Sequence, residues 1–352
     1  MEVRRGLMRC DGASFLGLGH VMRSLSLAHE LRARGWEVRF ATKPYENESA
    51  DRIRASGFAV DLIDPEAEGE PDLAETLRHA AAMGAELAVT DGYAFDTFFL
   101  RGLREAGLRV ASIDDIAAFH FPSDLLINQN IDAVDLPYDT AAYTRKLLGP
   151  TYAMLRPEFR RLRAEALARP MGDPPHVLIT FGATDLSRQT EKVISALRLV
   201  ARPVRATVLV GVGCRHAQEI EAAARGAKPE VRVLVNPPGV EGMMAAADIV
   251  VGAAGTTTWE VCCLGRPMLV MPVADNQRGI AHRMGEVGAA VNLGWFEEVT
   301  PEAIAAELER LLTDTAARQE MADRAAELTD GLGAGRVAEA IEESLCARAH
   351  CC

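Results

Sequence analysis

The stretch Gly17-Leu18-Gly19-His20-Val21-Met22-Arg23 joins a predicted strand to a predicted helix. An apolar run over residues 3–8 precedes it, and leucines and alanines at helical spacing follow it. Glycines at such a junction permit a tight turn and a close approach of the backbone to a ligand. The free N–H groups and the positive dipole end of the helix start favour an anion such as pyrophosphate. The stretch therefore predicts an anion site after the first strand of an α/β fold.

His20 stands at the mouth of this turn, and Arg23 follows one helical turn later on the same face. A helix start favours a neutral imidazole, which is able to accept a proton. His20 is therefore a candidate general base. The alternative is that His20 only caps an ordinary strand–helix turn.

The composition indicates a globular protein of two ordinary domains, with 352 residues, 49% apolar and 25% charged. No apolar run reaches the length of a membrane span, and a net charge of −12 disfavours nucleic acid and anionic membranes. Seven cysteines without a disulfide or zinc spacing favour reduced thiols and a cytoplasmic location. We expect a small-molecule ligand, no metal and no cofactor. The sequence leaves the oligomeric state open, and a monomer is the simpler expectation.

Strand and helix signals alternate almost to the end of the chain. Strands are expected at residues 3–8, 38–41, 59–63, 87–90, 108–113, 125–127, 177–180, 207–210, 231–235, 249–251, 268–271 and 290–293. Most are short continuous apolar runs, typical of parallel strands that are buried on both faces. Helices are expected to close the chain at residues 301–312, 316–328 and 334–346.

This order predicts two doubly wound, Rossmann-like α/β domains that face each other across a cleft. The N-terminal domain is expected over residues 1–160, the C-terminal domain over 161–335 and a helical tail over 336–352, because charge and prolines interrupt the apolar runs between 156 and 175. Ligands of such folds bind at the carboxyl ends of the strands. Polar or Gly-rich loops follow the expected strands at residues 91–93, 114–115, 182–185, 252–258 and 275–277.

Several of these loop residues have a structural alternative. Thr257 and Glu260 have the spacing of a capping box, so Glu260 either closes a helix start or accepts hydrogen bonds from ribose hydroxyls. Asp275 or Asn276 is either a helix N-cap or a ligand contact. Asp114-Asp115 could act as a paired carboxylate, but adjacent residues at a strand end point in different directions, so one of them is expected to cap a loop or helix.

A set of motifs in a fixed order resembles a known family. The motifs are the Gly17–Arg23 turn, Asp91-Gly92-Tyr93, Ile113-Asp114-Asp115-Ile116-Ala117, Leu125-Leu126-Ile127-Asn128-Gln129-Asn130, Tyr152-Ala153-Met154-Leu155-Arg156-Pro157-Glu158-Phe159, Thr180-Phe181-Gly182-Ala183-Thr184-Asp185, residues 252–265 and Asn276-Gln277. In this order the chain resembles the PseG family, hydrolases of UDP-2,4-diacetamido-2,4,6-trideoxy-β-L-altropyranose in pseudaminic acid biosynthesis. The resemblance extends from about residue 9 to about residue 294.

The resemblance implies a GT-B fold, shared with MurG-like glycosyltransferases, and release of UDP to water. It implies that His20 is the base, that Tyr93 and Asn276 contact the sugar, and that the loop before Glu260 holds UDP. Many family members carry His where this chain has Gly92. With the strand-end loops, the expected site comprises His20 as catalytic residue, Gly17, Gly19, Arg23, Tyr93, Asn276 and Gln277 for the substrate, and Gly182, Gly255, Thr256, Thr257 and Glu260 for UDP.

The chemistry of the residues is compatible with this reaction. Breaking the anomeric C–O bond requires a stabilised diphosphate leaving group and a base that orients and deprotonates water, which is assigned to His20. The resemblance implies attack of water at C1 with inversion. A UDP-sugar-dependent GT-B glycosyltransferase is the alternative, because the fold alone does not decide the acceptor. A non-catalytic sugar-nucleotide sensor is a third interpretation, which the presence of His20 disfavours.

Overall fold

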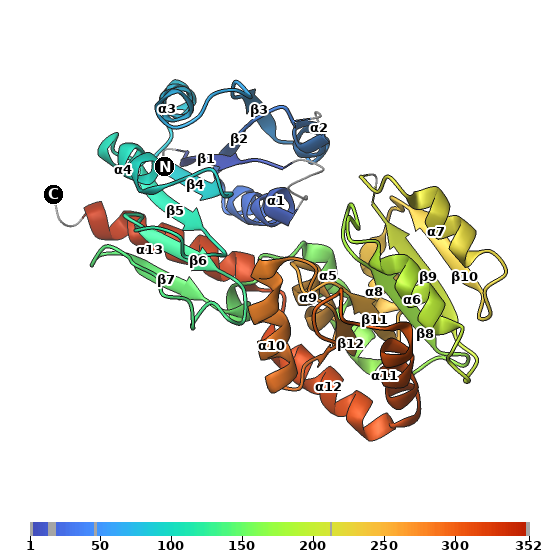
Figure 1. Ribbon diagram of the computed structural model, residues 1–352. Coiled ribbons are helices and arrows are strands. Elements are labelled where there is room, and N and C mark those ends of the chain that lie inside the picture. The colour runs from blue at the N-terminus through green and yellow to red at the C-terminus, as the bar shows by residue number, and fades with distance from the viewer. Residues whose placement is uncertain (1–2, 13–18, 46–47, 212, 350–352) are drawn as a thin grey trace. The chain divides into compact units, whose positions relative to one another are not determined.

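The chain forms two α/β units, each built on a parallel sheet. The computed structural model describes residues 3–12, 19–45, 48–211 and 213–349, so Gly17 lies outside the described residues. The first unit comprises residues 1–156 and 332–352, and the second comprises 157–331. The prediction of two doubly wound domains is confirmed (Figure 1).

The first unit contains a seven-stranded sheet in the order β3-β2-β1-β4-β5-β6-β7. All neighbouring strands pair in parallel. Its elements are β1 (Arg5–Cys10), α1 (Gly19–Ala33), β2 (Glu37–Thr42), α2 (Glu48–Ala55), β3 (Ala59–Leu62), α3 (Glu70–Met83), β4 (Leu87–Asp91), α4 (Thr97–Glu105), β5 (Arg109–Ile113), β6 (Leu125–Asn128), β7 (Arg145–Leu148), the 3₁₀ turn η2 (Pro150–Tyr152) and α13 (Gly333–Ala349).

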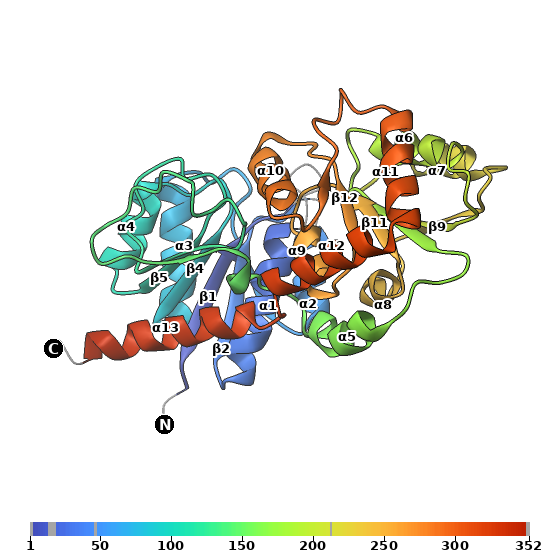
Figure 2. The ribbon, with the colours of Figure 1, turned by 90° about the horizontal axis from the view of Figure 1, so that it is seen from below.

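Alternating residues of these strands are buried on opposite faces of the sheet. Met8 and Cys10 pack with α1, α2 and α13, whereas Leu7 packs with α3 and α4. This period of two places helices on both faces, as Figures 1 and 2 show. The strand order reverses between β1 and β4, and the register sets Cys10 beside Asp91. Such a reversal is where open α/β sheets bind ligands.

The second unit contains a six-stranded parallel sheet in the order β10-β9-β8-β11-β12-β13. Its order reverses between β8 and β11. Its elements are α5 (Pro157–Ala168), β8 (His176–Thr180), α6 (Gln189–Leu197), β9 (Arg205–Val210), α7 (Ala217–Ala224), β10 (Val231–Val235), α8 (Val240–Ala245), β11 (Ile249–Gly252), α9 (Thr257–Cys263), β12 (Met268–Val270), the 3₁₀ turn η3 (Asp275–Gln277), α10 (Arg278–Glu286), β13 (Val291–Asn292), α11 (Pro301–Thr313) and α12 (Thr315–Leu328).

Local capping explains where the last helices begin. The Thr300 hydroxyl accepts a hydrogen bond from the Ala303 N–H at 3.3 Å before α11, and the Asp314 carboxylate accepts one from the Ala317 N–H at 2.9 Å before α12. Such caps satisfy N–H groups that have no partner within the helix. The three expected closing helices are confirmed, with ends that differ by up to three residues from the expected ones.

The structure differs from the expected organisation in three places. β7 (Arg145–Leu148) was not expected, because this edge strand carries Arg145 and Lys146 and lacks a continuous apolar run. The first division between the units falls after Arg156, so an expected boundary at 160 lies within α5. The closing helix α13 is part of the first unit and not a separate tail, since its apolar face is buried there. None of the described helices is long and apolar enough to cross a bilayer.

The packing of α13 yields a stability prediction. Ile341 is fully buried in the first core, whereas Glu339 on the same helix is exposed. Ile341→Ala should lower the free energy of unfolding of the first unit by about 2–5 kcal/mol, since it leaves a cavity. Urea denaturation followed by circular dichroism measures this loss. Glu339→Ala, the control, should change stability by less than about 0.5 kcal/mol. Equal effects of the two substitutions would contradict the packing of α13 on this core.

Candidate active site

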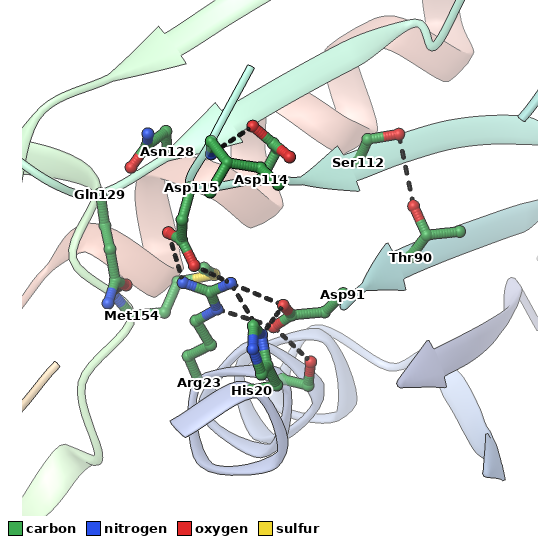
Figure 3. A network of polar contacts seen from close by, with 12 residues as sticks. His20, Arg23, Thr90, Asp91, Ser112, Asp114, Asp115, Asn128, Gln129 and Met154 are labelled. Carbon is green, nitrogen blue, oxygen red and sulfur yellow. Dashed lines mark hydrogen bonds and ion pairs between the residues drawn. The ribbon is translucent and has the colours of Figure 1, made fainter. Parts of the chain in front are cut away.

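His20 and Asp91 form a buried pair at the carboxyl edge of the first sheet (Figure 3). His20 lies in the first turn of α1, and Asp91 is the last residue of β4. Their Nδ1 and Oδ1 atoms are 2.7 Å apart, and the two residues are 8% and 0% exposed. The start of α1, which follows β1, therefore lies next to the end of β4, because β1 and β4 are neighbours where the strand order reverses.

Arg23 bridges Asp91 and a second carboxylate, Asp115. Its Nε and Nη2 donate to Asp91 at 2.7 and 2.6 Å, and its Nη1 and Nη2 donate to Asp115 at 2.9 Å each. These bonds use four of the five guanidinium N–H groups. Arg23 is only 3% exposed, so its position fits a structural link between the carboxylates better than the expected contact with substrate.

The same bonds determine the tautomer of His20. Its Nδ1 lies 3.1 Å from Arg23 Nη2, but both Nη2 hydrogens already point to the carboxylates. Nδ1 must therefore carry its own hydrogen, which it donates to Asp91. The lone pair of the neutral ring is then on Nε2. An imidazole oriented in this way by a carboxylate is the arrangement of a general base.

Asp91 is held in its charged form. Burial disfavours its ionisation, but the charges and hydrogen bonds of Arg23 and His20 outweigh burial and lower the pKa of Asp91. Ser24 adds a hydroxyl donor at 3.1 Å. A buried carboxylate with this many donors is stable only as an anion.

Asp114 and Asp115, which follow β5, accept hydrogen bonds from different groups, as expected for adjacent side chains at a strand end that point in different directions. Asp115 accepts from Asn130 Nδ2 at 2.9 Å in addition to Arg23. Asp114 accepts from the N–H groups of Ile116 and Ala117, at 2.8 and 2.6 Å, and so closes the loop. The prediction that one of the pair caps a loop is confirmed. The Asp114–Asp115 loop is further fixed by Tyr138, whose hydroxyl donates to Asp114 at 3.0 Å.

Tyr93 lies beside His20. Its ring meets that of His20 edge-on, with centroids 4.9 Å apart, and the residue is 46% exposed. Gly92, where many members of the resembled family have His, has φ +149°, a conformation that side chains disfavour. The backbone of this loop thus accounts for glycine at that position.

In the second unit, the expected UDP residues gather at the reversal of strand order between β8 and β11. Gly182 follows β8 with φ +80°. A Cβ on Gly252 would lie 2.4 Å from the Thr180 carbonyl oxygen, so only glycine fits this close approach. Gln277 Nε2 is the nearest described atom that a Cβ on Gly255 would meet, at 3.7 Å.

Two expected helix caps of the second unit, the Thr257–Glu260 capping box and an N-cap at Asp275 or Asn276, differ from the observed helix starts. Helix α9 begins at Thr257, and its N-cap is Thr256, whose side chain forms no capping bond, so Thr257 is not the N-cap that the expected capping box requires. Helix α10 begins after Gln277, while Asp275 and Asn276 belong to η3, so neither is its N-cap.

A cavity of about 730 Å³ in the second unit lies at the opposite edge of the sheet from these loops. Its arginines donate to main-chain carbonyl groups at helix ends: Arg266 to Leu264 and Ala247, and Arg163 to Cys263, Thr329 and Ala326. They thereby satisfy the acceptors that helices leave unpaired at their C-termini. None of the expected site residues lines this cavity.

Comparison with known proteins places the fold. The chain has the GT-B fold. It superposes on MurG of Acinetobacter baumannii with a TM-score of 0.72 over 97% of this chain and 99% of that one, at 17% identity. Residues 176–337 match the model of the glycosyltransferase family 28 C-terminal domain.

Sequence relatives extend over both units. The chain is 23% identical to the spore coat polysaccharide biosynthesis protein SpsG of Bacillus subtilis, over 95% of this chain and 96% of that protein. It is 26% identical to a UDP-N-acetylglucosamine--N-acetylmuramyl-(pentapeptide) pyrophosphoryl-undecaprenol N-acetylglucosamine transferase of Anaeromyxobacter, over 92% and 90%. It is also 26% identical to an uncharacterised protein of Methanocaldococcus jannaschii, over 76% of this chain, and spans about half (55%) of that protein. The chain is thus similar in sequence, over both units, to a protein named as an N-acetylglucosamine transferase.

Sequence reasoning missed part of this site. Asp91 and Asp115 were expected only as members of polar strand-end loops, Asp115 with the option of a paired carboxylate, and Asn130 only as part of a motif; none of the three was assigned to the catalytic or substrate residues. Their position at strand ends was the available signal. Their connection through Arg23 depends on the strand order, which the sequence does not reveal.

The lowered pKa of Asp91 yields a prediction about acid stability. A carboxylate with a lowered pKa contributes stability above its unfolded pKa of about 3.9, and this contribution is lost as the pH falls through the folded value. Asp91→Asn should therefore cost about 3–5 kcal/mol at pH 7, and the difference from wild type should shrink below about pH 4. Urea denaturation at several pH values measures this difference in the free energy of unfolding.

Asp323→Asn is the control, because Asp323 is exposed. Its effect should stay below about 0.5 kcal/mol throughout. A difference between wild type and Asp91→Asn that does not change with pH would contradict the lowered pKa.

Proposed function

We propose that this protein transfers the sugar of a UDP-sugar to a hydroxyl acceptor, with His20 as the general base. The observation that carries the proposal is the buried pair of His20 and Asp91, which directs the lone pair to Nε2. A base of this kind suits an acceptor hydroxyl that attacks C1. The match to the glycosyltransferase family 28 domain and the relative named as a UDP-N-acetylglucosamine-dependent transferase support a UDP-sugar donor.

The reaction assigns a separate task to each unit. In the first, His20 Nε2 takes the proton of the attacking hydroxyl, the acceptor oxygen bonds to C1, and the C1–O bond to UDP breaks with inversion. Asp91 stabilises the imidazolium that forms. Tyr93 contacts the sugar. In the second unit, Gly182, Gly255, Thr256 and Thr257 bind the diphosphate, Glu260 accepts hydrogen bonds from ribose, and Asn276 and Gln277 contact the sugar.

Hydrolysis is the second candidate, with water as the acceptor and UDP-2,4-diacetamido-2,4,6-trideoxy-β-L-altropyranose as the donor. One observation favours it: four of the motifs that resemble the PseG family, within residues 17–23, 91–93, 113–117 and 125–130, contribute residues to the network around His20. Asp115 and Asn130 come from two of these motifs, and both belong to the network around Arg23. The relative that is named as an N-acetylglucosamine transferase favours the transfer reaction.

One assay separates the two candidates. The protein is incubated with UDP-N-acetylglucosamine or with the UDP-diacetamido-trideoxyhexose in ¹⁸O-water, with and without sugar and lipid-linked acceptors, and UDP is followed by NMR. Transfer predicts UDP release only when an acceptor is present. Release in water alone, with the label on the sugar, would establish the hydrolase instead. Label in UDP would contradict both, because it requires attack at phosphorus.

The base is tested by His20→Asn. Loss of a general base lowers turnover by about 10²-fold or more, while UDP affinity should be unchanged, because the proposed UDP residues lie in the second unit. His29→Asn on the same helix is the matched control and should retain turnover. Near wild-type turnover in His20→Asn would show that another group is the base.

The ribose contact is tested by Glu260→Gln, which keeps the size of the side chain and removes its charge. We expect weaker UDP binding in calorimetry, with a loss of stability below about 1 kcal/mol. Glu286→Gln, on α10 in the same unit, should leave UDP affinity unchanged. A large loss of stability with unchanged affinity would give Glu260 a purely structural role.

A further inference from the structure

Asp91 is not the only charged group close to the His20 ring, because the positive charge of Arg23 lies nearby as well. Arg23 Nη2 lies 3.1 Å from the imidazole Nδ1, about as close as the Asp91 carboxylate at 2.7 Å. With one positive and one negative charge at similar distances, this pair would give little net stabilisation to a proton on the ring. A base that must hold a proton during the reaction needs a further negative charge nearby.

The other groups around the ring do not provide that charge. Cys10 on β1 lies beside Asp91, but burial raises the pKa of its thiol, which is therefore neutral. Ser24 on α1 is a neutral donor to Asp91. Tyr93 contributes an aromatic ring that lies perpendicular to that of His20. Asp114 directs its carboxylate to main-chain N–H groups of its own loop. Among the described groups, Asp115 is the remaining carboxylate in contact with this network.

We infer that Asp115 is a positioning residue for the base: it neutralises Arg23, so that the charge of Asp91 acts on His20. Both Asp115 oxygens accept from Arg23 at 2.9 Å, in a bidentate pair. The buried cluster then carries two carboxylates and one guanidinium, an excess of one negative charge. A proton on His20 brings the cluster to neutrality.

Asn130 maintains this arrangement. Its Nδ2 donates to Asp115 at 2.9 Å, and its own N–H donates to Asn128 Oδ1 at 2.9 Å. Asp115 is 8% exposed in its side chain, so water screens its charge weakly. Asn128 and Asn130, at the end of β6, thus hold the Asp115 carboxylate, which acts on His20 through Arg23.

The inference concerns the chemistry of the proposed function, but its test needs no substrate. Protein with ¹⁵N-labelled histidine is titrated, and long-range ¹H–¹⁵N spectra follow the His20 ring, assigned by its loss in His20→Asn. In Asp115→Asn, the midpoint of the His20 titration should move to lower pH by about one unit, because a compensating negative charge is removed. Asp115→Glu, which keeps the charge, should restore the midpoint.

The double variant Arg23→Gln with Asp115→Asn removes one charge of each sign. It should also return the midpoint towards the wild-type value, and it buries no unpaired arginine, so it tests the inference even if Asp115→Asn does not fold. Asp124→Asn is the matched control, because Asp124 is buried and pairs with Arg109 at 2.6 Å in the same unit. It should leave the midpoint unchanged.

Two outcomes would overturn the inference: an unchanged midpoint in Asp115→Asn, or a double variant whose midpoint does not return. Failure to release UDP from either donor would contradict the proposed function, and the titration would still stand. If a donor is turned over, the acid limb of the pH profile of kcat/KM should move to lower pH in Asp115→Asn and not in Asp124→Asn.

Discussion

The candidate site of the first unit depends on one buried carboxylate. Asp91 ends β4, is fully buried, and accepts from His20, Arg23 and Ser24, all on α1. It therefore fixes the start of α1 against the sheet at the point where the strand order reverses. Leaving such a charge unpaired in the interior would cost several kcal/mol, on the order of 3–5, so these donors and their helix are held in place together with it.

The two sheets have similar topology but different chemistry at their carboxyl edges. The edge of the first unit carries the charged side chains of Arg23, Asp91 and Asp115 in a network that also includes His20. The edge of the second unit is rich in glycine, and Gly252 approaches the backbone of Thr180 closely. Charged, oriented side chains suit proton transfer, whereas exposed main-chain groups suit a diphosphate. The division of tasks in the proposed reaction follows from this difference.

The GT-B fold of the chain does not decide the acceptor. Solved structures under 20% identical to this chain share its fold, and a fold supports several reactions. The base that deprotonates a sugar hydroxyl also deprotonates water. The geometry around His20 is therefore common to both candidates, and the acceptor-dependence of UDP release distinguishes them.

The sequence by itself determined the two parallel α/β domains, most strands and the closing helices, because buried parallel strands are continuous apolar runs and helix caps are local. It also identified His20 and the glycine loops, which stand in short contiguous motifs. It missed β7, whose exposed edge allows charged residues, and the packing of α13, which depends on a core formed by residues far away in the sequence, such as Leu25 and Leu125. Only the tertiary structure joined His20, Asp91 and Asp115 through Arg23. These residues come from three segments, and strand order, a long-range property, brings them together.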